Sequence, residues 1–126
     1  MLVSAVVTAR DFVQSARQDD GSYRLNDWPQ VRTRRGRGLN PRKAVTRLRV
    51  AQRLLMGFLD PVEDALFLTA GLRRLGVRSL FQLGRELAPG MGPAGFYAWV
   101  ECAGEVVSTS LPVHEEYIVV HRSAEG

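Results

Sequence analysis

Residues 60–76, DPVEDALFLTAGLRRLG, predict a short helix with a defined start and end. Asp60 is a favoured N-cap residue, and Pro61 suits the first helical turn because its missing N–H is not needed there. Two acidic residues follow at once and complement the positive end of the helix dipole. Gly76 is positioned to end the helix in the left-handed conformation. Apolar residues cover most of the circumference, which indicates a central, largely buried helix.

The helix predicted just before this stretch is amphipathic. Asn40 can cap it and Pro41 can occupy its first turn. Apolar residues then recur at steps of three and four over about 18 residues, which is typical of one buried stripe. The members of that stripe are Ala44, Val45, Leu48, Ala51, Leu55, Phe58 and Leu59. Basic side chains lie mainly outside it, so we expect this helix to pack against the helix of residues 60–76.

The chain after residue 76 reads as strands. Residues 77–83 and 96–102 predict two strands, separated by a Gly- and Pro-rich loop over 84–95. Ala103-Gly104 predicts a hairpin turn, after which residues 105–108 return antiparallel. Residues 116–121 predict a last strand. One central helix against a small antiparallel sheet is an α+β fold.

The order of these motifs resembles the transglutaminase-like leader peptidases of lasso-peptide biosynthesis. LRRLGV at residues 72–77 is followed by FYAWVE at residues 96–101 and a glycine hairpin. In that family of papain-type cysteine proteases, a Cys opens a helix of the type SLALxxLLRRxGI, and a HAWVE strand and an Asp follow. The resemblance covers residues 40–121. It implies a transglutaminase-like (papain-like) domain over 40–126, preceded by a poorly assigned segment with a basic loop over 1–39, and a strand that faces the helix start.

The resemblance also shows that the catalytic residues of the family are missing. Cysteine proteolysis needs a thiolate at a helix N-terminus, a His that accepts its proton, and an Asp or Asn that orients the His. Asp60 or Pro61 stands at the nucleophile position, Tyr97 replaces the general base, and Ser108 or Thr109 stands at the third position. Tyrosine, with an ordinary pKa of about 10, is a poor proton acceptor near neutrality.

Other residues offer little replacement chemistry. The single cysteine, Cys102, is expected to be a small buried hydrophobe, and His114 and His121 are expected at the surface. A Cys102–His114 pair is the only thiol catalysis these residues offer, and it ranks low. The acidic residues Asp60, Glu63 and Asp64 are explained by helix capping, so no metal is predicted. The glycine pairs at residues 36–38 and 90–92 fit neither a phosphate loop nor a dinucleotide fingerprint, so no cofactor is predicted.

Composition and charge set the broad class. The chain has 126 residues, 45% hydrophobic and 24% charged, which is typical of one globular domain. No apolar run approaches the roughly 20 residues that span a bilayer, and the N-terminus lacks the features of a signal peptide. A cytoplasmic protein without a membrane span is therefore the default expectation.

The net charge of +4 is concentrated in one block of nine basic residues without an acid. Its members are Arg32, Arg34, Arg35, Arg37, Arg42, Lys43, Arg47, Arg49 and Arg53. This block is either a solvated helix face with a basic loop or a surface that meets phosphates or an acidic peptide. No aromatic residues are interleaved to stack on bases, so a nucleic-acid-binding module ranks last.

These observations favour a lasso-peptide maturation protein that has lost hydrolysis and binds a precursor (leader) peptide or a partner maturation protein. The alternatives are an active peptidase or other enzyme with an unorthodox site, and a nucleic-acid-binding module. The candidate binding residues are Tyr97, Trp99, Glu101, Arg42, Arg49 and Arg53.

Overall fold

The computed structural model describes residues 2–19, 22–25, 28–29, 40–87 and 96–123. In this part of the chain the α+β prediction is confirmed. The helices are α1 (Leu2–Ala16), α2 (Pro41–Met56), α3 (Pro61–Arg74) and the short α4 (Val113–Glu116). The strands are β1 (Leu80–Glu86), β2 (Phe96–Cys102), β3 (Glu105–Val106) and β4 (Tyr117–Arg122).

Both long-helix caps form as their residue types predict. The Asn40 side chain accepts the N–H groups of Arg42 and Lys43, and Asp60 accepts the N–H of Glu63 at 2.8 Å. Gly76 is left-handed with a φ of 90°. The predicted stripe of α2 extends too far, because Gly57 ends the helix with a φ of 75°. Phe58 therefore lies beyond the helix and is exposed.

The described strands form one antiparallel sheet in the order β3-β2-β1-β4. The predicted hairpin turn is confirmed, since Ala103 and Gly104 both have positive φ. The first strand begins later than predicted, at Leu80, because the preceding residues close the end of α3 instead. Val77 donates to the carbonyl of Leu72, and residue 79 bonds to the same helix. The predicted 84–95 loop starts too early, since β1 runs to residue 86; residues 88–95 and the predicted 32–39 loop lie outside the described residues.

The N-terminal helix α1 shares its hydrophobic core with the rest of the fold. From the sequence alone this segment is either a helix or a strand, because its valines have no clear period. The small buried residues Ala5, Ala9 and Ala16 complete a helical face that packs on α3. Trp28 lies between Phe12 of α1 and Phe81 of β1, with ring centroids at 4.8 and 5.3 Å. Helix α1 and Trp28 are thus tied to the helix and the sheet that follow them.

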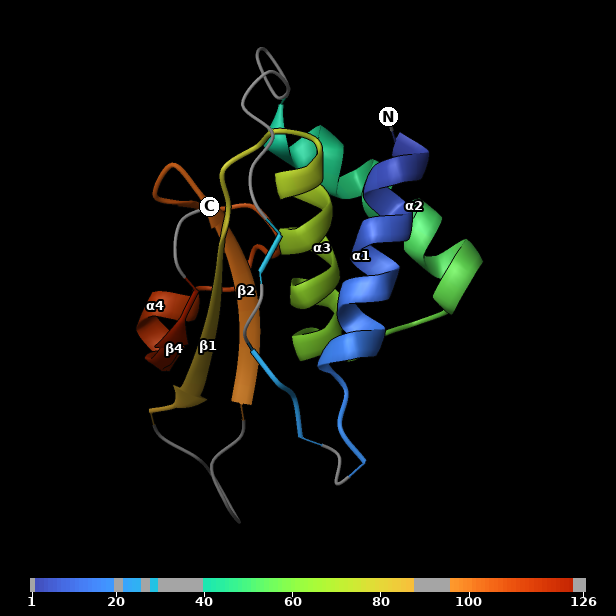
Figure 1. Cartoon of the computed structure of the whole chain (residues 1–126). Coiled ribbons are helices and arrows are strands. Elements are labelled where there is room, and N and C mark those ends of the chain that lie inside the picture. The colour runs from blue at the N-terminus through green and yellow to red at the C-terminus, as the bar shows by residue number, and fades with distance from the viewer. Residues whose placement is uncertain (1, 20–21, 26–27, 30–39, 88–95, 124–126) are drawn as a thin grey trace.

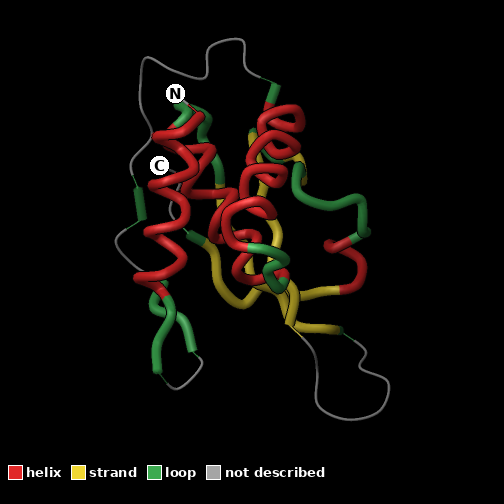
Figure 2. The backbone as a smooth tube through the Cα atoms, turned by 90° about the vertical axis from the view of Figure 1, so that its right-hand side faces the viewer, coloured by secondary structure: helices red, strands yellow, loops and turns green. Residues whose placement is uncertain are grey.

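The helices and the sheet form layers. In Figure 1, α3 lies against the sheet with α1 and α2 beyond it, and α4 lies on the other side of the sheet. The turned view in Figure 2 places the strands behind the long helices. Within the described segments, no helix is both long and apolar enough to cross a membrane.

Candidate functional site

The start of α3 is closed by its own polar side chains. The Asp60 carboxylate caps the helix and also accepts a hydrogen bond from the Tyr23 hydroxyl at 3.2 Å. Arg17 of the N-terminal segment pairs with Glu63 in the first turn. Burial, followed by the nearby Asp60 charge, raises the pKa of Tyr23 to about 12. The position that the resemblance aligns with the nucleophile of the leader peptidases therefore carries a capping carboxylate and Pro61, neither of which is a thiol.

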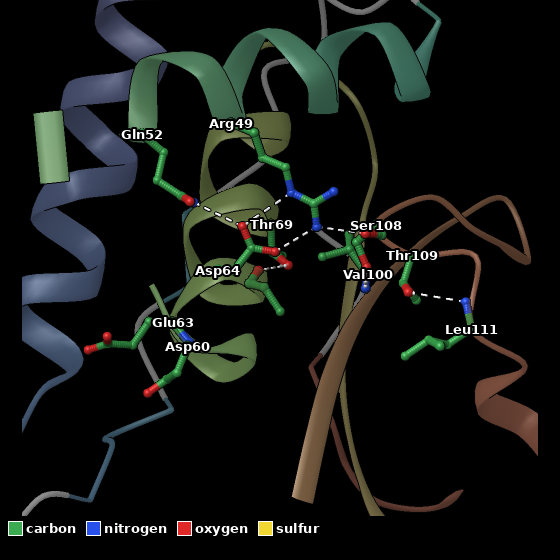
Figure 3. Close-up of polar contacts among 11 residues, drawn as sticks. Arg49, Gln52, Asp60, Glu63, Asp64, Thr69, Val100, Ser108, Thr109 and Leu111 are labelled. Carbon is green, nitrogen blue, oxygen red and sulfur yellow. Dashed lines mark hydrogen bonds and ion pairs between the residues drawn. The ribbon is translucent and has the colours of Figure 1, made fainter. Parts of the chain in front are cut away.

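A second polar network joins α2, α3 and the segment after β3 (Figure 3). The Asp64 carboxylate accepts Arg49 Nη2 at 2.7 Å and Gln52 Nε2 at 3.1 Å. The same Arg49 nitrogen donates to the carbonyl of Ser108 at 2.6 Å. Asp64 thus has a structural partner on α2 in addition to its place in the first turn of α3.

Ser108 and Thr109, which the resemblance aligns with the third triad residue, accept backbone hydrogen bonds. The Ser108 hydroxyl accepts the N–H of Val100 on β2 at 2.9 Å. The Thr109 hydroxyl accepts the N–H of Leu111 at 3.1 Å (Figure 3). Both hydroxyls accept backbone N–H groups, Ser108 from β2 and Thr109 from the chain after the hairpin, and no histidine is hydrogen-bonded to either among the described residues.

The expectation that FYAWVE faces the start of the helix is wrong for Tyr97, Trp99 and Glu101. Successive strand side chains point to opposite faces. The alternate residues Ala98 and Val100 belong to the core shared with α3. Tyr97, Trp99 and Glu101 consequently point to the face that α4 covers. The structure does not bring Tyr97 together with Asp60 or Pro61.

On that opposite face the three side chains form a compact aromatic and polar cluster. Tyr97 stacks on Tyr117 of β4 with a centroid separation of 5.6 Å. Glu101 Oε2 accepts the indole N–H of Trp99 at 3.0 Å and lies 3.0 Å from His114 Nε2. Trp99 is fully buried and Glu101 nearly so, whereas the His114 side chain is 59% exposed. His114 is therefore a partner of Glu101 as well as a surface residue.

The only cysteine lies in the core, as predicted. Cys102 is buried, and burial raises the pKa of its thiol to about 11. His114 contacts the other face of the sheet, so the hypothetical Cys102–His114 pair does not form. The prediction that His121 lies at the surface is only partly right. Its ring lies 6.3 Å from that of Phe81, and its Nε2 is buried without a hydrogen-bond partner among the described residues.

The three arginines of α2 that were candidates for binding a partner make different contacts. Arg42 donates to Glu105 and to the carbonyl of Val106, both at 3.0 Å, which fastens α2 to the hairpin. Arg49 belongs to the Asp64 network. Arg53 is exposed and lies over the ring of Phe58, 4.7 Å from its centroid. Two of the three arginines proposed to bind a partner therefore already bind this chain.

Sequence reasoning missed a buried arginine and an apolar groove. Arg73 is 1% exposed and donates to the carbonyl of Ser79 at 2.8 and 3.1 Å. The groove lies between α1 and α2. The sequence feature that could have predicted the groove is the C-terminal end of the apolar stripe of α2. This end is still apolar where the helix no longer packs on α3, so it is exposed.

Among the described residues, no group of three His, Cys, Asp or Glu side chains is placed to hold a metal ion. Comparison of the chain with models of protein families, with curated proteins and with solved structures finds no match.

Proposed function

We propose that this chain is a non-hydrolytic relative of the leader peptidases of lasso-peptide biosynthesis, which acts by binding a precursor peptide or a partner maturation protein. The proposal is supported by the LRRLGV and FYAWVE motifs in the order of that family. A transglutaminase-like fold is part of the proposal. Its support is the chain order, in which a buried helix precedes the antiparallel strands that it packs against.

The observation that carries the proposal is the chemistry at the start of α3. Asp60 is the N-cap, and Pro61 is the first helical residue. A cysteine protease needs a thiolate at this point, because the helix dipole lowers the thiol pKa there. The one thiol of the chain is instead buried on β2 with a raised pKa. The face on which Tyr97 lies is a further departure from the arrangement of a nucleophile and a facing base.

Peptide cleavage tests the proposal directly. A lasso-peptide precursor from the same organism is incubated with the purified chain and the other maturation proteins, and the products are followed over time by mass spectrometry. We expect the precursor to stay intact and to bind. Leader cleavage that Tyr97→Phe or Cys102→Ala abolishes would refute the proposal.

The alternative function, nucleic-acid binding, is tested by measuring how affinity depends on salt concentration. A surface that neutralises phosphates loses affinity steeply as salt rises, because counterions are released on binding. Arg42 and Arg49 already contact Glu105 and Asp64, so fewer cations of α2 remain for phosphates. We expect weak binding to single-stranded DNA and no steep salt response; tight, strongly salt-dependent binding would favour the alternative.

A further inference from the structure

The first two helices leave a groove of about 370 Å³ open on the surface. Its lining is chiefly apolar and comes from both helices: Val3, Val6, Val7 and Arg10 of α1, and Leu54 and Leu55 of α2. Val3 is 76% exposed and Leu54 is 85% exposed. Grouped apolar side chains at a concave surface mark an interaction site more often than single exposed ones do.

Among the described residues that line the groove there is no carboxylate, and the charged one is Arg10. Arg10 does contact Asp11 at 3.3 Å, but an exposed pair of neighbours contributes little. Helix α2 carries five basic residues and no acid. Of these, Arg47 is exposed and lies one helical turn before Ala51, on the side that lines the groove.

We infer that the groove binds an amphipathic helical segment of an acidic peptide. Apolar side chains at i, i+3, i+4 and i+7 of such a segment would enter between α1 and α2, and its carboxylates would meet Arg10 and Arg47. The concave shape suits a helix better than a lipid surface, on which an amphipathic helix lays a convex apolar face. A second copy bound through the same groove would bring two basic α2 helices together. This inference deepens the proposed binding function and rests on it for the identity of the natural partner.

A designed probe tests the groove without knowledge of that partner. The probe is a fluorescent peptide of about 15 residues, enough for four helical turns, with Leu at the i, i+3, i+4 and i+7 positions and Glu elsewhere. A matched peptide carries Lys in place of Glu. Binding is measured by fluorescence anisotropy at several salt concentrations. We expect the Glu peptide to bind, with affinity that falls as salt rises, and the Lys peptide to bind far more weakly.

Two variants locate the contact on the protein. Leu54→Asp is expected to weaken binding at least about tenfold, as loss of a central apolar contact does. Arg47→Glu is expected to weaken it several-fold and to flatten the salt response. Leu111→Asp and Arg78→Glu make the same changes at other exposed positions and should leave the affinity unchanged. Circular dichroism checks that each variant folds.

Three outcomes would overturn the inference. These are unchanged affinity in Leu54→Asp, equal binding of the Lys peptide, and binding of anionic phospholipid vesicles in place of the probe. The test of the groove can fail or succeed independently of the proposed function. If a precursor binds wild type and Leu54→Asp equally, only the groove assignment fails. If the probe binds but no precursor does, the groove stands and the place in lasso-peptide maturation fails.

Discussion

The single cysteine, Cys102, lies in the core and not at the start of α3. Its thiol is buried between the sheet and the helices, where an ionised sulfur would lose its hydration. Burial, followed by the nearby Glu105 charge, raises its pKa from the ordinary 9.0 to about 11. At neutral pH the thiol is protonated, which is the state of a structural cysteine.

This raised pKa predicts a pH dependence of stability. Because the folded state keeps a proton that the unfolded chain releases, the contribution is complete below pH 9 and is lost as the pH rises to about 11. The free energy of unfolding, measured by urea denaturation across this range, should therefore fall. The fall should be smaller in Cys102→Ala. Identical pH profiles for the two proteins would show that the thiol is not protected by burial.

At the scale of elements, the face of the sheet opposite α3 depends on a glycine. A Cβ added at Gly84 of β1 would lie 2.7 Å from the Trp99 ring and 2.8 Å from the Cβ of Tyr117. Neither neighbour yields easily, since one is a buried ring and the other is attached to the backbone. We expect Gly84→Ala to lower the free energy of unfolding by about 1–3 kcal/mol, as overpacking does. Gly57→Ala tests the opposite case, because nothing lies within 4 Å of the added Cβ and any cost there comes from the positive φ of 75°.

The Arg49–Asp64 network predicts a measurable coupling between α2 and α3. Arg49 and Asp64 are 32% and 18% exposed, so solvent screens the pair only in part. A double-mutant cycle with Arg49→Ala and Asp64→Ala, read by urea denaturation, should give a coupling of about 1 kcal/mol. The same cycle for the more exposed pair Arg42 and Glu105 should give less. Equal coupling in the two cycles would mean that burial does not strengthen the Asp64 contact.

At this scale, the sequence predicts the features that depend on interactions between neighbouring residues. The caps at Asn40 and Asp60 and the turn at Ala103-Gly104 were predictable, because each depends on a few neighbouring residues. The face of the sheet to which Tyr97 points was not predictable. Strand alternation separates two sets of side chains, but packing against α3 decides which set is inside. Here the small Ala98 faces the helices, while Trp99 packs against His114 of α4 and Tyr97 stacks on Tyr117 of β4.

At the scale of the whole molecule, the described residues before residue 40 (2–19, 22–25 and 28–29) contribute to the same core as the helices and strands that follow. Helix α1 packs on α3, and Trp28 bridges α1 and β1. This arrangement could not be predicted from the valines of α1, because its alanines supply half of the buried face. It also creates the groove. Helices α1 and α2 both cover α3, but neither covers the outer apolar residues of the other.

The proposed function is tested most directly by recovering what the protein binds. The tagged chain is purified from its native host, and mass spectrometry identifies the bound peptides and proteins. We predict an intact precursor peptide or a lasso-peptide maturation enzyme. A leader-free, trimmed peptide as the bound species would contradict the account, because it would show that the chain cleaves its substrate without a thiolate at the start of α3.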